Sequence, residues 1–402
     1  MADDHTDKFN NFNVAIFEPY CDFSTNPTLM ALTVKLIRLG ANIDLYSPGF
    51  GNYPGIQLPI NQFVFPYRPR LWCYGPKRTW QNWKRYFLTR AWRSHRSLKK
   101  IKYDLVLGID HEGIIAAWEF ARKANVPMLY LSFELMFRDE LKKFSEVKEK
   151  QDEIRCSRQA DIIVIQDERR AKLLINENSI DENKIVYLPV SPGYSKPITS
   201  DYLRNKFQIP LDKKIVLHSG SFEKWTYPNE LINSLQSWPA NVLLVIHTRD
   251  NPKNRNPYIN RLRISKPANL ILSTEPLGQV EYEEMVASAD IGLILYKPLL
   301  QGRVLQKNIE FIGLASGKFS HYMKHGLPVI SIRQKCYSEL LKKYKFGIDI
   351  PDFSLMGESI AKILNNYEQY KSQASRLFLE RLDFEANWKP LEKRLTSILS
   401  LS

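Results

Sequence analysis

Short apolar runs alternate with amphipathic, helix-like segments along most of the chain. In the first half these runs predict strands over 14–17, 43–46, 104–109, 128–132, 162–165 and 184–188. In the second half they predict strands over 214–218, 242–247, 270–272, 291–295 and from 329 onward. Buried parallel strands have continuous apolar sequences, and helices form the crossovers between them. The pattern therefore predicts an α/β fold built on parallel sheets.

Start and stop signals divide this pattern into two halves of similar size. Asn26 and Pro27 form a typical helix start and Gly40 a typical helix stop, which predicts a helix over about 26–39. Four prolines lie within 189–210, with Ser and Gly between the first three, and this composition indicates an interdomain linker. Each half carries its own alternation of strands and helices, which predicts two Rossmann-like units.

The stretch over 313–330 carries the strongest local signal. Small residues lead into a short helix that starts near Ser316 and ends at Gly326, with Pro328 before the next strand. Free N–H groups at such a helix start favour an anion. Lys318 places a positive charge in the first turn, where the helix dipole favours an acid, so we expect an anion such as a diphosphate to compensate both. The alternative is an ordinary helix–Gly–Pro–strand connection that binds nothing.

This stretch resembles the donor-binding signature of GT-B glycosyltransferases, in particular the retaining sugar-nucleotide-dependent group known as family 4 or group 1. The residues that match the signature are Ser316, Lys318, Tyr322, Met323, Gly326, Pro328, Val329 and Ile330. The resemblance implies two Rossmann-like domains that face each other across a cleft: an acceptor-binding domain over 1–190 and a nucleotide-sugar-binding domain over 191–375. It also implies a C-terminal helix over 376–402 that crosses back onto the first domain.

The resemblance further implies which residues hold the donor. They are Gly220, Ser221, Lys224, Leu277, Gly278, Glu310, Ser316, Gly317, Lys318 and His321. The turn over 219–221 follows a strand, and a glycine there lets the backbone approach a phosphate closely. Lys224 stands in for the Arg that relatives carry at the Ser221 position, and the loop over 274–278 would bracket the nucleotide base. A simple tight turn and a plain surface loop are the alternative interpretations of these two segments.

Two carboxylates of the family pattern are missing. Many relatives carry a Glu-x7-Glu pair across the signature, with one Glu for the donor sugar and one for the ribose hydroxyls; the corresponding residues here are Gly313 and His321. His321 can still hydrogen-bond a hydroxyl, and Glu310 is a candidate substitute for the first Glu. The loss of both carboxylates keeps open a catalytically degenerate, glycosyltransferase-like binding subunit.

Polar residues after strands of the first half define the expected acceptor side. Asp110, His111 and Glu112 follow an apolar strand, and ligands of open α/β sheets bind outside such strand ends. We expect these three residues to be catalytic, through contact with the acceptor hydroxyl or the transferred sugar, with Glu18 and Glu134 in the same cleft. The alternative is that Asp110 or Glu112 caps the next helix.

By the same resemblance, transfer with retention needs no protein base, because the leaving phosphate takes the acceptor proton. Stabilisation of the diphosphate charge then falls to Ser316, Gly317 and Lys318. The sequence has no Asp-x-Asp motif. We therefore expect a metal-independent hexosyltransferase with a UDP- or GDP-sugar as co-substrate and no tightly bound cofactor.

Composition fits a folded cytoplasmic protein of two domains. The 402 residues are 44% hydrophobic and 12% aromatic. The four cysteines are far apart and include no Cys-x-x-Cys pair, which argues against a zinc site or a disulfide framework and fits a reducing compartment. The polar N-terminal residues are not expected to form a secretory signal, and no run approaches eighteen apolar residues.

The net charge of +14 comes mostly from one segment. Positions 45–103 hold twelve Lys and Arg, most of them within 68–102, and no acidic residue, which leaves 45 basic and 43 acidic residues elsewhere. A basic amphipathic helix over 77–100 with Trp at its apolar edge is typical of a membrane surface. The residues expected to contact a membrane or an anionic acceptor are Trp80, Trp83, Lys84, Arg85, Arg90 and Arg93. The alternatives are packing on the protein core, and nucleic-acid binding, which no recognised motif supports.

Together these features predict a glycosyltransferase that moves a sugar from a nucleoside diphosphate to a glycan or lipid-linked glycan, in cell-envelope polysaccharide or glycoconjugate synthesis. We expect it in the cytoplasm, at the inner face of the membrane. Two alternatives remain open. One is a sugar-nucleotide epimerase of GT-B fold, which would leave the basic aromatic segment unexplained, and the other is the degenerate binding subunit.

Overall fold

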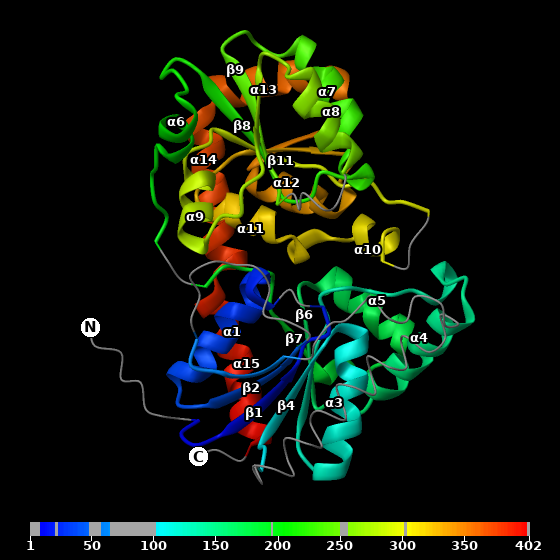
Figure 1. Cartoon of the computed structure of the whole chain (residues 1–402). Helices are drawn as coiled ribbons and strands as arrows, with labels where there is room; N and C mark the ends of the chain where they lie inside the picture. Colours follow the sequence, from blue (N-terminus) through cyan, green and yellow to red (C-terminus); the bar gives the residue numbers. More distant parts are fainter. Residues whose placement is uncertain are drawn as a thin grey trace.

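Two parallel sheets, each covered by helices, lie one above the other (Figure 1). The computed structural model describes residues 9–20, 23–47, 58–64, 102–193, 196–249, 256–300 and 304–399. The predicted basic helix over 77–100 lies outside the described residues, and so do its six candidate contact residues.

The first sheet has seven strands in the order β3-β2-β1-β4-β5-β6-β7, and every pair is parallel. Its strands are β1 (Asn13–Phe17), β2 (Asn42–Ser47), β3 (Asn61–Val64), β4 (Leu105–Ile109), β5 (Met128–Leu131), β6 (Ile162–Ile165) and β7 (Ile185–Tyr187). The helices that join them are α1 (Pro27–Arg38), α3 (Asp110–Ala124), α4 (Phe144–Ser157) and α5 (Glu168–Asn178). The strand order reverses between β1 and β4, so ligands are expected at the carboxyl ends of these two strands.

The second sheet has six parallel strands in the order β10-β9-β8-β11-β12-β13. They are β8 (Lys214–Ser219), β9 (Val242–His247), β10 (Leu270–Ser273), β11 (Ile291–Ile294), β12 (Val329–Ile332) and β13 (Gly347–Ile350). Its helices are α6 (Tyr202–Phe207), α7 (Pro228–Ser234), α8 (Pro257–Ser265), α9 (Gln279–Ala287), α10 (Lys307–Glu310), α11 (Gly317–Lys324), α12 (Ser338–Tyr344), α13 (Met356–Asn365) and α14 (Tyr367–Leu377). Here the order reverses between β8 and β11.

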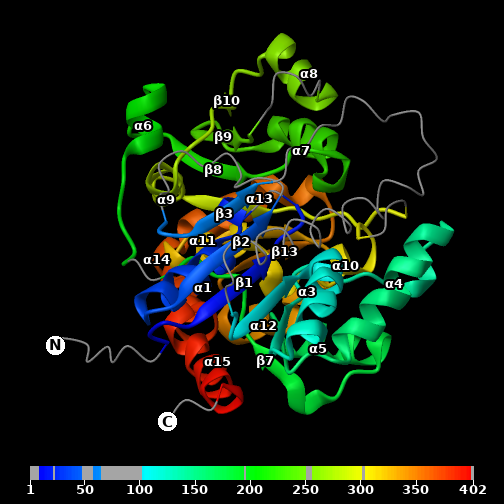
Figure 2. The same ribbon diagram turned by 60° about the horizontal axis from the view of Figure 1, so that its bottom comes forward.

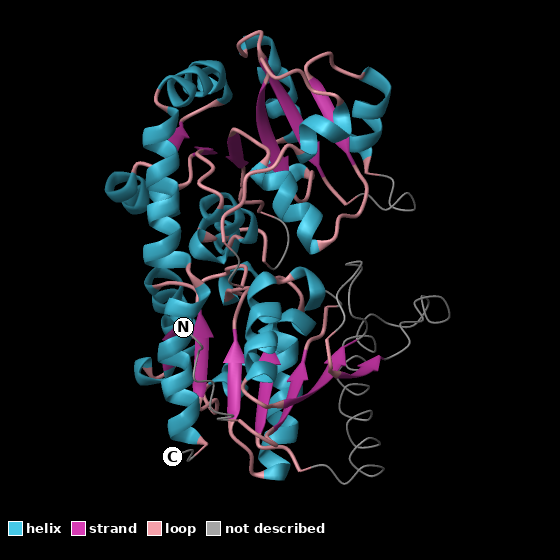
Figure 3. Cartoon of the chain, turned by 90° about the vertical axis from the view of Figure 1, so that its left-hand side faces the viewer, coloured by secondary structure: helices cyan, strands magenta, loops and turns pink. Residues whose placement is uncertain are grey.

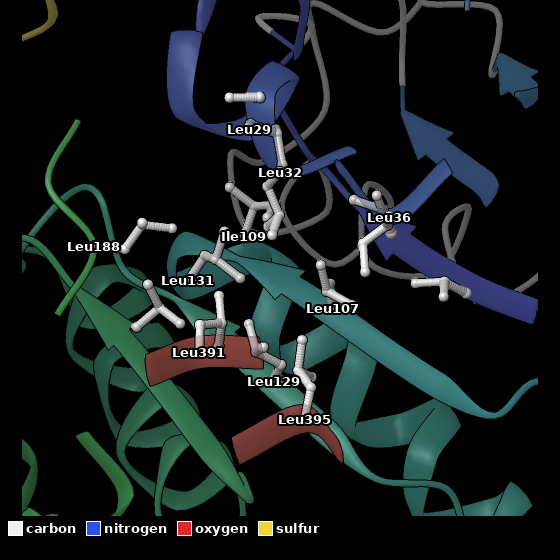
Figure 4. Close-up of a cluster of buried hydrophobic side chains, with 14 of the residues drawn as sticks. Leu29, Leu32, Leu36, Leu107, Ile109, Leu129, Leu131, Leu188, Leu391 and Leu395 are labelled. Atoms are coloured by element: carbon white, nitrogen blue, oxygen red, sulfur yellow. The ribbon is translucent and has the colours of Figure 1, made fainter. Parts of the chain in front are cut away.

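The last helix, α15 (Phe384–Ile398), leaves the second domain and packs on the first (Figures 1 and 3). Trp388, Leu391 and Leu395 of α15 are buried in the apolar core beneath the first sheet. Figure 4 shows Leu391 and Leu395 facing Leu129 of β5 and neighbouring strand residues. The C-terminal helix therefore completes the core of the first domain.

The apolar runs locate the central strands of both sheets correctly. The apolar pattern does not predict β3 and β13, which are edge strands of the two sheets. Asn61 and Gln62 are exposed polar residues of β3, and Asp349 interrupts the apolar pattern of β13. An edge strand has one unpaired side facing solvent, so it does not need the continuous apolar sequence that identifies a buried strand.

Candidate active site

The helix α11 begins at Gly317, as the sequence predicts, and Ser316 caps it. The Ser316 side chain accepts a hydrogen bond from the Phe319 backbone N–H at 3.2 Å. Its Oγ also lies 2.5 Å from the hydroxyl of Tyr296, just beyond β11. The cap residue is thus fixed on both sides, which orients the first turn of α11.

Lys318 carries an ammonium group that needs an anion. Part of its side chain is accessible, but Nζ itself is covered from solvent and has no hydrogen-bond partner among the described residues. Nζ lies 5.0 Å from the centre of the Tyr296 ring, which supplies a weak cation–π contact. Burial lowers the pKa of Lys318 to about 7, because the charged form is poorly solvated there. A diphosphate would supply the missing charge and hydrogen bonds.

The turn after β8 lies beside this ammonium. A Cβ placed on Gly220 would be 3.8 Å from Lys318 Nζ, and the φ of +98° at Gly220 favours glycine. His218, at the end of β8, is fully buried, and its Nε2 lies 3.1 Å from the Ser221 carbonyl oxygen. Burial, together with the charge of Lys318, lowers the pKa of His218 to about 3. Lys318 therefore lies close to a neutral imidazole.

His321, which the sequence predicts as a contact for a ribose hydroxyl, lies against a carboxylate. Its Nδ1 lies 3.0 Å from Oε1 of Glu283, which belongs to α9. The same carboxylate contacts Lys324 at 2.8 Å and His325 at 2.5 Å. Burial opposes ionisation of Glu283, but hydrogen bonds from the two histidines and the Lys324 charge together hold its pKa well below the usual range. The sequence could not reveal Glu283, because it reaches α11 from a separate helix.

The other candidate donor residues differ in exposure. Ser221 and Lys224 are exposed after β8, and Glu310 is exposed at the end of α10. Leu277 packs in the apolar core of the second domain, so only its backbone is available to a base. Gly278 is the N-terminal flanking residue of α9. Their roles stay predictions.

On the first domain, Glu18 lies buried at the carboxyl end of β1. It accepts a hydrogen bond of 2.5 Å from the Tyr20 backbone N–H and another of 2.5 Å from the Ser47 hydroxyl. Glu18 thus fixes the loop that follows β1.

Asp110 joins the start of α3 to the loop that follows β5. It is the first residue of α3, with φ of +52°, and no side-chain cap bond is found at this helix start. Its Oδ1 instead accepts hydrogen bonds from the backbone N–H groups of Phe133 at 2.6 Å and Glu134 at 2.8 Å. Asp110 therefore holds the loop after β5 against the start of α3.

Replacing Asp110 separates this hydrogen-bonding role from its charge. Asp110→Ala should lower the free energy of unfolding by about 2–4 kcal/mol, because two N–H groups lose their acceptor and alanine disfavours positive φ. Asp110→Asn keeps an acceptor oxygen and tolerates this backbone conformation, so its loss should stay below about 1 kcal/mol. Chemical denaturation of both variants measures the difference. Equal losses would contradict this account.

His111 and Glu112 form a cluster with Glu149 of α4. His111 is buried, its Nε2 lies 2.9 Å from Glu149 Oε1, and the Tyr20 hydroxyl lies 3.0 Å from the same nitrogen. One side-chain nitrogen or oxygen atom from each of His111, Glu112 and Glu149 could bind a metal ion, and these three atoms lie within 4.8 Å of one another. Side chains that hydrogen-bond to one another lie at the same distances as side chains that share a metal ion, so this spacing alone does not indicate a metal. Metal-independent transfer therefore stays a prediction. Glu149 could not be found from the sequence, since it lies on a different helix.

A cavity of about 660 Å³ lies between β7 and α15. Val186, Tyr187, Arg381 and Arg394 are among the residues that line it, whereas the candidate donor residues do not. This cavity is therefore separate from the Lys318 corner.

The two doubly wound domains with a returning C-terminal helix form the GT-B fold. Sucrose-phosphate synthase from Thermosynechococcus elongatus is similar with a TM-score of 0.71 and 13% identity, over 98% of this chain and 100% of that one. Anabaena HepE, in complex with UDP and glucose, is similar with a TM-score of 0.67 and 14% identity, over 96% and 100%. WaaG, a glycosyltransferase involved in lipopolysaccharide biosynthesis, is similar with a TM-score of 0.63 and 14% identity, over 95% of this chain and 99% of that one. No protein-family model and no curated protein sequence matches the chain.

Proposed function

We propose that this chain is a glycosyltransferase that moves a sugar from a nucleoside diphosphate to an acceptor hydroxyl with retention. The observation that carries the proposal is the covered, unpartnered Nζ of Lys318 beside the first turn of α11, in the part of the chain that the structure describes. A helix start and an ammonium together favour a diphosphate. A fold shared with HepE, crystallised with UDP and with UDP-glucose, supports UDP as the nucleotide.

In the proposed reaction the bond between the sugar's anomeric carbon and the β-phosphate oxygen breaks. The acceptor oxygen bonds to that carbon on the same face, and its proton passes to the departing phosphate oxygen. Charge develops on the diphosphate as the bond breaks, so Lys318 and the N–H groups near Gly317 stabilise the transition state more than the ground state. Gly220 leaves room for the phosphate beside them.

The acceptor would enter from the first domain. Glu18, Asp110, His111, Glu112 and Glu134 come directly or shortly after its strands β1, β4 and β5. The basic segment over 68–102 favours an acceptor that is anionic or held at a membrane, such as a lipid-linked glycan, and a cytoplasmic place at the membrane periphery. In the described part of the chain, none of the helices has both the length and the apolar character needed to cross a bilayer.

Thermal stability in the presence of UDP, GDP, TDP, ADP and CMP tests the donor site. A nucleotide at about 100 times its Kd should stabilise the protein by about 2.7 kcal/mol, which raises the Tm by several degrees. We expect UDP to give the largest shift. The absence of a shift with every nucleotide would contradict the proposed donor site.

Product analysis separates the remaining alternatives. A glycosyltransferase releases nucleoside diphosphate from the sugar nucleotide when an acceptor is present. An epimerase of the same fold converts the sugar nucleotide without needing an acceptor, and a degenerate binding subunit at most binds it. The missing Glu-x7-Glu carboxylates are the observation that favours the binding subunit, so release of nucleotide decides against it.

A further inference from the structure

A short segment of the second domain, residues 304–316, is docked on the first domain. It contains α10, which lies between the two domains (Figures 1 and 2). The Lys307 backbone N–H donates to Glu140 at 2.9 Å, and the Leu314 N–H donates to Asp167 at 3.2 Å. The Val190 N–H donates to the Leu314 carbonyl at 2.8 Å. The docking is therefore made of specific hydrogen bonds along the whole segment.

Asn308 is the centre of this contact. It is buried, and its Oδ1 accepts from the Leu135 backbone N–H at 2.9 Å and from Arg170 at 3.1 Å. Its Nδ2 donates to the Val304 carbonyl at 3.3 Å and to the Glu134 carboxylate. These four bonds use every hydrogen-bonding position of the amide. No other side chain of this size offers two donors and an acceptor in that arrangement.

Arg170 of α5 joins the same contact from the first domain. Its side chain is 1% exposed. One guanidinium nitrogen donates to the Phe133 carbonyl at 2.6 Å and to Asn308, and another donates to the Phe311 carbonyl at 3.1 Å. Arg170 therefore donates hydrogen bonds to backbone carbonyl groups of both domains.

Glu134 lies where these bonds converge. Its backbone N–H donates to Asp110, its preceding carbonyl accepts from Arg170, and its carboxylate accepts from Asn308. The Glu134 side chain nevertheless remains exposed. It is thus a fixed carboxylate that solvent, or an acceptor hydroxyl, can still reach.

We infer that Asn308 and Arg170 are positioning residues that hold the Glu134 carboxylate for the acceptor only while the donor domain is docked on the first. The inference rests on the proposed transferase function. It connects the two halves of the reaction, because the segment that holds Glu134 leads directly into Ser316 and Lys318. Separation of the two domains would therefore move the Glu134 carboxylate away from Lys318.

Asn308→Asp tests the inference with minimal change in volume. The substitution keeps the acceptor for Leu135 and Arg170 but replaces the donor to Glu134 with a like charge. We expect unchanged nucleotide binding, a kcat lowered by tenfold or more, and a larger radius of gyration in X-ray scattering. Glu134→Ala, which truncates an exposed side chain, should give the same loss if Asn308→Asp folds poorly. Lys362→Ala, at an exposed lysine of α13 outside the docked segment, should leave kcat and the radius of gyration unchanged.

The double change Asn308→Asp with Glu134→Gln separates docking from chemistry. The glutamine amide can donate to the carboxylate introduced at position 308, so the compact radius should return, whereas kcat should stay low because the Glu134 carboxylate is absent. Full turnover and a compact shape in the Asn308→Asp single variant would overturn the inference. If wild type neither binds nucleotide nor releases it, the proposed function fails, and the scattering measurement still decides whether Asn308 holds the domains together.

Discussion

Lys318→Met should abolish stabilisation by UDP and lower turnover by a factor of about 10²–10³, the range for loss of one preorganised group that stabilises developing charge. Methionine fills a similar volume without the charge, so the protein should fold normally. Without ligand it should be at least as stable as wild type, because the change removes a covered ammonium that has no hydrogen-bond partner among the described residues. Thermal shift, calorimetric titration with UDP and nucleotide release measure the three effects.

Lys362→Met is the matched control, since Lys362 is an exposed lysine of α13 in the same domain and belongs to neither candidate site. We expect it to keep most of the UDP affinity. A Lys318→Met variant that binds UDP as tightly as wild type would place the diphosphate elsewhere.

The Lys318 site also predicts how UDP binding depends on pH. Its folded-state pKa of about 7 lies below the ordinary 10.5, so the folded protein releases this proton before the unfolded chain does. The free energy of unfolding should therefore gain a rising contribution between about pH 7 and 10.5. A bound diphosphate favours the ammonium, so UDP affinity should fall above pH 7, approaching tenfold per pH unit. Titration in two buffers of different ionisation enthalpy detects the proton uptake, and Lys318→Met should show none.

Glu283→Gln should destabilise the second domain by about 3 kcal/mol or more. Glutamine removes the carboxylate that pairs with buried Lys324, and breaking a buried ion pair in this way leaves an uncompensated charge. It also removes the negative charge from the 3.0 Å contact with His321, so UDP affinity should fall if His321 contacts the ribose. Urea unfolding measures the first effect and calorimetric titration the second.

Glu281→Gln, on the exposed face of the same helix, should change stability by less than about 0.5 kcal/mol.

The pKa of Glu283 is lowered from an ordinary value of 4.5, so its stabilising contribution is complete above that pH and is lost progressively as pH falls below it. Glu283→Gln should therefore flatten the acid side of the stability curve. Equal acid sensitivity in wild type and variant would show that the carboxylate is not held in its ionised form.

The fold was predictable because burial on both faces gives central strands an apolar sequence that a single chain reveals. The start of α11 was predictable for a similar reason, since Ser316, Gly326 and Pro328 act through local backbone geometry. The side chains that contact and orient the candidate site residues were not predictable. Glu283 reaches His321 from another helix, and Arg170 and Asn308 meet across the domain boundary, so their roles depend on packing between segments far apart in sequence. Asp110 was found as a candidate, but its hydrogen bonds to the loop after β5 required the structure.

The return of α15 to the first domain has a consequence for synthesis of the chain. The leucines of β4, β5 and α1 are covered by Trp388, Leu391 and Leu395, which are made about 200 residues after β7, the last strand of the first domain. At ordinary elongation rates this interval lasts roughly 10–40 s. During that time the nascent first domain exposes an apolar face, so a chaperone that shields it, or the emerging second domain itself, must protect the chain from aggregation until its last helix arrives.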